Sequence, residues 1–134
     1  MTRYLLDTGI ASDYVNNRLG VRQKVTQAFR RGDRVGICTP VYGELVAGVE
    51  GSNGPPRHRA QLERKLRHLS HWPFEKPAGA EFGRLMAELR QIGRPMQQVD
   101  IQIAAIALTL GCTVVTKDSD FQAIPDLTIE EWSI

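Results

Sequence analysis

The segment Tyr4–Gly9 constrains the fold more than any other part of the chain. Three apolar or aromatic residues (4–6) lead directly into Asp7, and the small residues Thr8 and Gly9 follow at once. This pattern is typical of a buried strand that ends and passes into a helix. Asp7 would then lie at the carboxyl end of a strand, which is the edge where open parallel α/β sheets bind their ligands. The segment therefore predicts an acidic side chain at a ligand-binding edge.

Strand-like and helix-like patterns alternate along the rest of the chain. Alternation of this kind indicates parallel strands joined by helical crossovers, with helices on both faces of the sheet. At 134 residues the chain is long enough to form a core without disulfides or metals. The sequence therefore predicts one α/β domain over residues 1–134, an α/β/α sandwich around a short central parallel sheet of about four to five strands. We expect further strands over 34–38, 71–74, 112–116 and 127–129, and helices over 10–17, 21–31, from 39 through at least 49, and over 61–69, 78–92 and 99–110.

Local signals refine three of these elements. Thr39 and Pro40 predict a helix start in which the threonine hydroxyl is the N-cap and proline takes the first helical position. The segment 99–110 is apolar almost all round, so it should be the most buried helix, with Gly111 as its cap. Pro73 moves the third predicted strand toward an edge of the sheet, because proline cannot donate to a central ladder.

Composition excludes several classes of protein. An apolar content of 42% with 24% charged residues is ordinary for a soluble globular domain and argues against disorder. Cys38 and Cys112 stand alone in apolar segments, so we expect buried thiols in a reducing cytoplasm rather than a zinc site or a disulfide framework. No apolar run approaches the roughly 20 residues of a membrane span, and the first residues do not resemble a signal peptide. We therefore expect a cytoplasmic protein that does not associate with membranes.

Three further acids can join Asp7 at the ligand-binding edge. Asp118 lies in the turn just beyond an apolar strand, Asp100 opens the predicted buried helix, and Glu44 lies early in a helix that follows a strand. Each of these positions belongs to the carboxyl edge of a parallel sheet. Carboxylates that meet there raise one another's pKa, and a divalent cation relieves the repulsion. A set of oxygen donors without histidine suits Mg²⁺ or Mn²⁺, ions that activate water for phosphodiester hydrolysis.

Each acid also has a simpler explanation. Asp100 can serve only to stabilise the positive end of its helix, and Asp118 can be only an N-cap for a short turn. Glu44 taken alone is typical of a solvated helix residue. Asp7 is the hardest to explain in this way, because a carboxylate directly after a buried strand is costly to bury without a partner.

Four segments together resemble PIN-domain ribonucleases, specifically the VapC toxins of bacterial toxin–antitoxin pairs. The resemblance extends over the whole chain, and its strength lies in the order and spacing of the motifs rather than in any one of them. The segments are Leu5–Thr8, Tyr42–Gly48, Val99–Ala105 and Val115–Phe121, and the ending from Ile124 to Trp132 is also similar.

The resemblance implies a PIN-like fold and a Mg²⁺- or Mn²⁺-dependent endoribonuclease activity that uses a water activated by the ion. It carries metal-site and catalytic roles onto Asp7, Glu44, Asp100 and Asp118. Asp120 matches a further acid that is often present in the family. Thr116 matches a hydroxyl beside the site that holds a carboxylate or a water, and Gly9 stands where relatives commonly carry Asn or Ser.

The resemblance also implies the partners. These are an RNA substrate, a cognate VapB-type antitoxin and a second copy of the chain in a homodimer. Apolar side chains on the two early helices and the middle helical pair would form the groove for the antitoxin. The thirteen arginines against four lysines suit phosphate recognition, although genomic base composition explains the same bias. Single-stranded or loop RNA would be held by arginines at the rim such as Arg84, Arg90 and Arg94.

Three other functions fit parts of the sequence. The tripeptide from Asp7 to Gly9 also occurs in aspartic proteases, but their all-β scaffold does not match the helical pattern here. A phosphatase with Asp7 as nucleophile usually has a second Asp two residues later, where this chain has Gly9. A PIN-like binding module without activity is the third alternative, and retention of all four acids argues against it. His68 and His71 are three residues apart, yet we interpret these and His58 as surface residues rather than zinc ligands.

Overall fold

The computed structural model describes residues 1–132. Five strands lie in this part of the chain: β1 (Arg3–Leu6), β2 (Arg34–Cys38), β3 (Ser70–Trp72), β4 (Thr113–Val115) and β5 (Ile129–Glu130). The helices are α1 (Thr8–Val15), α2 (Val21–Arg30), α3 (Thr39–Gly51), α4 (Arg57–Leu66), α5 (Lys76–Gln91) and α6 (Gln98–Leu110), followed by a short 3₁₀ helix, η1 (Ser119–Ala123).

The strands form one sheet in the order β3-β2-β1-β4-β5, and all neighbours in it are parallel. The chain builds outward from β1 to β3 on one side, then crosses to the other side of β1 to add β4 and β5. The strand order therefore reverses between β1 and β4, and a reversal of this kind creates the crevice where open α/β sheets bind ligands. The predicted parallel sheet is confirmed, and β3 is an edge strand as Pro73 indicated.

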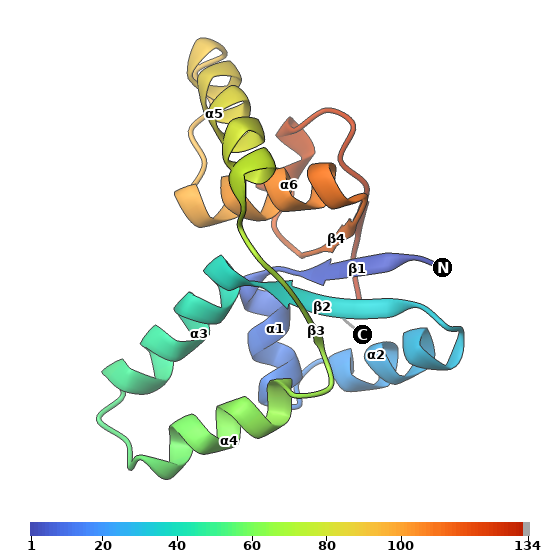
Figure 1. Ribbon diagram of the computed structural model, residues 1–134, viewed down its shortest axis with the longest axis vertical. Helices are drawn as coiled ribbons and strands as arrows, with labels where there is room; N and C mark the ends of the chain where they lie inside the picture. Colours follow the sequence, from blue (N-terminus) through green and yellow to red (C-terminus); the bar gives the residue numbers. More distant parts are fainter. Residues whose placement is uncertain (133–134) are drawn as a thin grey trace.

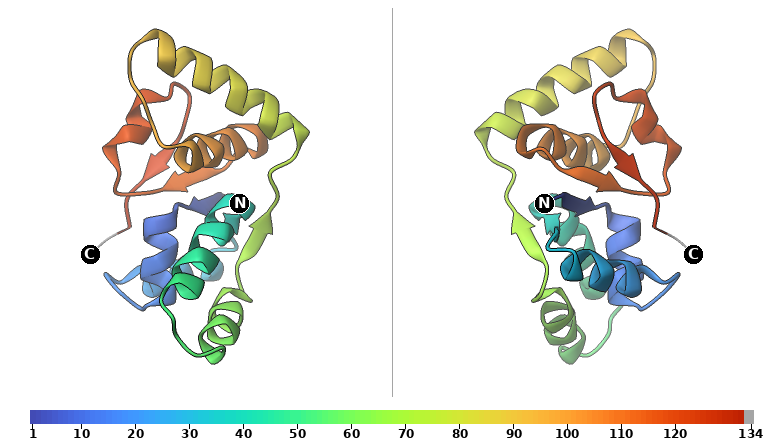
Figure 2. Two further views of the ribbon diagram at one scale, coloured as in Figure 1. Left: turned by 90° about the vertical axis from the view of Figure 1, so that its left-hand side faces the viewer. Right: turned by 90° about the vertical axis from the view of Figure 1, so that its right-hand side faces the viewer.

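Helices cover both faces of the sheet. α5 and α6 lie on one face, and α1, α2 and α3 lie on the other, where α4 packs beside α3 (Figure 1, Figure 2). Figure 1 also shows that α1, α3 and α6 all begin at the end of the sheet toward which the strands point. The predicted α/β/α sandwich is thus confirmed, and the starts of these three helices surround the carboxyl edge.

The core lies between the sheet and these helical layers. Leu5 and Leu6 of β1 are fully buried, and the interior face of α6 contributes Ile103 and Ile106 to the same core. α6 is the most buried helix, as its apolar sequence predicts, and it ends at Gly111 in a left-handed conformation with φ of 70°. Burial of this helix holds its first turn at the carboxyl edge of the sheet.

The start of α3 differs from the prediction. Cys38 occupies the N-cap position, and the Thr39 hydroxyl lies within the helix, 2.8 Å from Nε2 of His71. The N-cap assignment for Thr39 was therefore wrong, because β2 runs into α3 without an intervening residue and the hydroxyl instead contacts the neighbouring strand β3. Pro40 lies in the first turn, but at the second helical position rather than the predicted first one.

Several other boundaries differ by one to four residues, and those of α4 and β5 are instructive. α4 begins at Arg57, four residues before the predicted start at Gln61, and it ends at Leu66 rather than Leu69. Its first turn carries few apolar residues, so hydrophobic periodicity did not mark it. The last strand begins at Ile129, two residues after the predicted start at Leu127. Strand pairing with β4, rather than β-branched composition, sets that boundary.

Smaller expectations can also be compared with the structure. Cys38 and Cys112 are free and buried, which confirms the expectation of buried thiols. His68 and His71 are exposed, whereas His58 is half-buried. Within residues 1–132, no helix is both long and apolar enough to cross a membrane.

Candidate active site

Asp7 is the innermost acid of the candidate site. It follows β1 directly and serves as the N-cap of α1, where its Oδ1 accepts a 2.8 Å hydrogen bond from the backbone N–H of Ile10. Its other oxygen accepts a 2.5 Å hydrogen bond from the Thr116 hydroxyl, and the residue is only 8% exposed. Burial raises the pKa of Asp7 above its ordinary value, and these two hydrogen bonds oppose that increase.

Thr116 joins Asp7 to the segment that carries Asp118. The Thr116 hydroxyl accepts a 2.9 Å hydrogen bond from the backbone N–H of Asp118 while it donates to Asp7. The Asp118 carboxylate in turn accepts a 2.9 Å hydrogen bond from the backbone N–H of Asp120, and it caps η1. Asp118 is therefore the N-cap that the simpler explanation described, and it also lies beside Asp7 at the carboxyl edge.

Asp100 shows that the acids share one region. It lies in the first turn of α6, half-buried, and its pKa is raised to about 6. Burial is the largest cause, and the negative charges of the other acids add to it. These charges act on Asp100 because they lie near it, so the structure brings all five acids predicted from the sequence to one edge of the sheet. The four that act on Asp100 are Asp118, Asp7, Glu44 and Asp120.

Glu44 lies in the second turn of α3 with its side chain exposed. The Thr8 hydroxyl donates a 2.5 Å hydrogen bond to its Oε1, so the starts of α1 and α3 are joined at this point. Sequence reasoning did not identify Thr8 as part of the site. The available signal was a hydroxyl residue immediately after the strand-end aspartate, a position that must lie at the same edge.

The chemistry of these donors fits a hard divalent cation. All are carboxylates, and Asp7 and Asp100 are removed from water and subject to repulsion that a cation would relieve. Over residues 1–132, however, no three His, Cys, Asp or Glu side chains are already placed closely enough to hold an ion. Asp118 accepts its capping bond from the Asp120 N–H, and Glu44 accepts its bond from the Thr8 hydroxyl.

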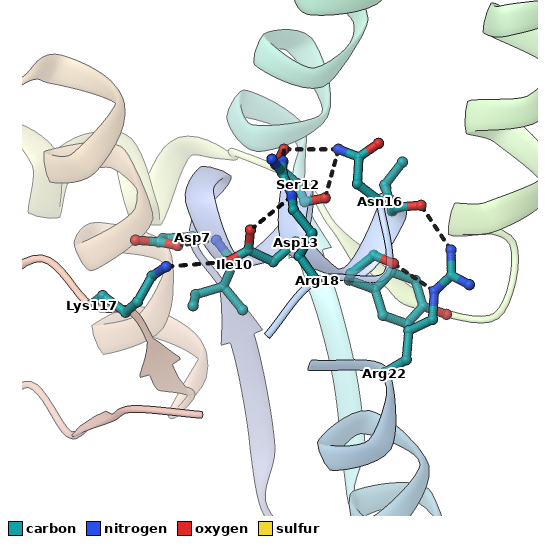
Figure 3. A network of polar contacts seen from close by, with 10 residues as sticks. Asp7, Ile10, Ser12, Asp13, Asn16, Arg18, Arg22 and Lys117 are labelled. Carbon is teal, nitrogen blue, oxygen red and sulfur yellow. Dashed lines mark hydrogen bonds and ion pairs between the residues drawn. The ribbon is translucent and has the colours of Figure 1, made fainter. Parts of the chain in front are cut away.

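A second charged cluster lies beside the acids. Lys117 extends from the loop after β4 to α1, where its Nζ is 3.3 Å from Oδ2 of Asp13 (Figure 3). Nε of Arg18 is 3.5 Å from the other oxygen of the same carboxylate, and Asp13 is only 8% exposed. Sequence reasoning missed this cluster, because nothing in the spacing of these residues brings them together.

The three arginines proposed as RNA contacts differ in their surroundings. Arg84 forms ion pairs with Glu81 and Glu88 on its own helix, α5. Arg90 and Arg94 are exposed, at the end of α5 and in the connection that leads to α6. Because that connection ends close to Asp100, these two arginines lie nearer the acidic edge along the chain than Arg84 does.

The fold and the acidic edge together define a class: small three-layer α/β proteins with a carboxylate cluster at the switch point of a parallel sheet. The chain belongs to the PIN-domain family, whose model matches residues 4–127.

Known proteins of this family resemble the chain over nearly its whole length. The tRNA(fMet)-specific endonuclease VapC of Shigella flexneri is 29% identical over 135 residues, covering 99% of this chain and all of that protein. VapBC2 from Rickettsia felis, solved bound to a DNA fragment from its promoter, contains a chain with a TM-score of 0.89 and 26% identity, covering 98% of this chain and 100% of that one. DNA-bound VapBC from Salmonella typhimurium gives a TM-score of 0.89 and 29% identity, covering 98% of this chain and 99% of that one. The resemblance to VapC toxins is therefore confirmed.

Proposed function

We propose that this protein is a metal-dependent endoribonuclease and the toxin of a toxin–antitoxin pair, with residues 1–134 forming one catalytic domain in the cytoplasm. The observation that carries the proposal is the gathering of carboxylates at the switch point of the sheet, where Asp7 follows β1, Asp100 lies in the first turn of α6 and Thr116 joins Asp7 to the segment of Asp118. Burial and the neighbouring acids raise the pKa of Asp100 to about 6, which agrees with this placement. A relative with the same domain length is named as an endonuclease specific for a transfer RNA.

A magnesium or manganese ion is the cofactor we propose. Asp7 and Asp100 would be the principal ligands, Glu44 and Asp118 would complete the site, and Asp120 is a further candidate. When bound, such an ion lowers the pKa of a water and neutralises charge on the phosphate under attack.

The chain's own residues prepare this site in distinct ways. Thr116 and the N–H of Ile10 both donate to Asp7, which favours its ionised form despite burial. The Thr8 hydroxyl orients Glu44 toward the start of α1. Burial and the neighbouring carboxylates raise the pKa of Asp100 to about 6, so a cation beside it would favour its ionised form. These contacts keep buried carboxylates available as ligands and as acceptors for a proton from water.

RNA is the proposed substrate, and arginines at the rim are the proposed contacts. Arg90 and Arg94 are exposed and precede α6, whereas Arg84 is already paired with two glutamates. Of the three, Arg84 is therefore the least available to a phosphate. Single-stranded or loop RNA suits an open edge of this kind, because its backbone is accessible.

The proposed protein partner is a VapB-type antitoxin, and a homodimer is the proposed state of the toxin. An open pocket of about 500 Å³ lies between α1, α2 and the turn after α4, with Phe29 40% exposed in its lining. Apart from His68, its lining belongs to α1 and α2, the two early helices that we expect to contribute to the antitoxin groove. The lining residues are Tyr14, Arg22, Val25, Thr26, Phe29 and His68.

The proposed function can be tested with purified protein and total RNA in the presence of Mg²⁺, Mn²⁺ or EDTA. We expect the wild type to cleave RNA only with a divalent cation, and Asp7→Asn and Asp100→Asn to be inactive while remaining folded. Asp126→Asn is the matched control, because Asp126 is exposed and its φ of 67° suits asparagine. Cleavage in EDTA, or undiminished cleavage by the Asp100 variant, would contradict the mechanism. Phosphate release from phosphomonoesters with intact RNA would instead indicate a phosphatase.

A further inference from the structure

We propose that Lys117 binds a phosphate of the RNA backbone at the acidic edge and that Asp13 positions it there. This inference rests on the proposed nuclease function and adds a substrate-binding residue to it.

The backbone of Lys117 is fixed within the acidic site. Its neighbour Thr116 donates to Asp7, and the N–H of its other neighbour, Asp118, donates back to Thr116. The positive charge of Lys117 also acts on Asp7, where it lowers the pKa. Lys117 therefore brings an ammonium group close to Asp7, the innermost of the candidate metal ligands (Figure 3).

The ion pair with Asp13 holds the Lys117 ammonium in place, yet the cluster of Lys117, Asp13 and Arg18 keeps a net positive charge. Asp13 is nearly buried, and its two oxygens face two cations, Lys117 at 3.3 Å and Arg18 at 3.5 Å. Two positive charges on one carboxylate leave a net charge of about +1 beside the acids. Because Arg18 already compensates Asp13, Lys117 is not its only counter-charge.

Lys117 can still accept a ligand in this position. An ammonium group has three N–H donors, and one is directed to Asp13. The side chain is 41% exposed, so the remaining donors can reach a phosphate oxygen from solvent. In contrast, Arg84 uses its guanidinium on two glutamates of its own helix.

An acidic edge needs such a cation if RNA is to approach it. Several carboxylates repel RNA, which is a polyanion. The ammonium group of Lys117 beside them attracts a phosphate to one defined side of the cluster. Lysine acts as a point charge on phosphate, so its contribution should be independent of base sequence and sensitive to salt. The chemistry therefore indicates a backbone phosphate rather than a base.

The first test measures RNA binding without cleavage. In an Asp100→Asn background, anisotropy of a short fluorescein-labelled single-stranded RNA is followed across a range of KCl concentrations. We expect Lys117→Met to weaken binding about fivefold at ~0.1 M salt and to reduce the slope of log Kd against log salt by about 0.7, the amount for one phosphate contact on a single strand. Lys24→Met on α2 is the matched control and should change neither quantity.

The second test separates binding from a structural role. In the active protein, Lys117→Met should raise KM for RNA more than it lowers kcat. Lys117→Arg keeps the positive charge, so its KM should stay close to that of the wild type. Asp13→Asn should also raise KM, because it removes the ion pair that positions Lys117. If Lys117 only neutralised Asp13, the double variant Lys117→Met/Asp13→Asn would recover both thermal stability and wild-type KM. Recovery of KM in the double variant, or an unchanged salt slope, would overturn the inference. Absence of cleavage by the wild type would instead contradict the nuclease function.

Discussion

The Thr116 hydroxyl donates a 2.5 Å hydrogen bond to the Asp7 carboxylate, although the two residues are 109 positions apart in the chain. They lie at the ends of β4 and β1, the adjacent strands between which the order of the sheet reverses. Among the interactions that lower the pKa of Asp7 against the effect of burial, this hydrogen bond is the largest. One threonine therefore favours the ionised form of the innermost acid of the site.

Removal of that hydroxyl should impair the site without disrupting the core. Thr116→Val preserves shape at a position that is 3% exposed, but it leaves Asp7 and the Asp118 N–H without this partner. We expect RNA cleavage to fall roughly 10- to 100-fold and the free energy of unfolding to fall by about 1–3 kcal/mol. Thr116→Ser keeps the hydroxyl and should retain most of the RNA cleavage and most of the free energy of unfolding. Equal activity of the valine and serine variants would show that the bond is dispensable.

The raised pKa of Asp100 predicts a specific dependence of stability on pH. Its pKa is about 6 in the folded protein and 3.8 as the ordinary value, so between these limits the folded state holds a proton that the unfolded state has lost. The free energy of unfolding contributed by this group therefore falls as the pH rises through that window. Thermal unfolding in EDTA measures this effect. As the pH rises from about 4 to 7, we expect the unfolding temperature of the wild type to fall relative to that of Asp100→Asn. A constant difference would mean that the carboxyl is not perturbed.

Removal of divalent cations should destabilise the wild type near neutral pH. A ligand that binds only the folded state stabilises it by about 2.7 kcal/mol at a concentration 100 times its Kd. We therefore expect Mg²⁺ or Mn²⁺ to raise the unfolding temperature of the wild type and EDTA to reverse the effect. Asp7→Asn and Asp100→Asn should respond weakly, and KCl at matched ionic strength provides the control for screening. An equal response from all three proteins would place ion binding elsewhere.

Gly36 of β2 should tolerate no side chain. A Cβ built there would lie 2.8 Å from both the Ser70 Cβ and the Trp72 ring of β3, and closer still to the Ser70 carbonyl oxygen. Gly36→Ala should therefore displace β3 and cost about 1–3 kcal/mol, as overpacked sites do. Gly83→Ala in α5 meets nothing within 4 Å and should stabilise the helix by up to about 1 kcal/mol. Chemical denaturation of the two variants measures both effects.

Much of the fold was available from the sequence because its signals are local. The alternation of apolar strands and amphipathic helices predicted the parallel three-layer arrangement, and the apolar run over 99–110 predicted the most buried helix. An aspartate immediately after a strand, as at Asp7, or a few residues beyond one, as at Asp118, lies at the carboxyl edge whatever the strand order. The first turn of α4 was missed, because without apolar periodicity a helix leaves little trace in the sequence.

The sequence by itself therefore determined the class of fold and the acids that reach one edge, since strand and helix periodicity specify which end of an element a residue occupies. Only the tertiary structure decided which strands are neighbours, and so that β1 and β4 place Thr116 against Asp7. It also decided the pairing of Lys117 with Asp13 and of Thr8 with Glu44. These contacts join residues far apart in the chain, and their geometry depends on how whole elements pack, which no local pattern encodes.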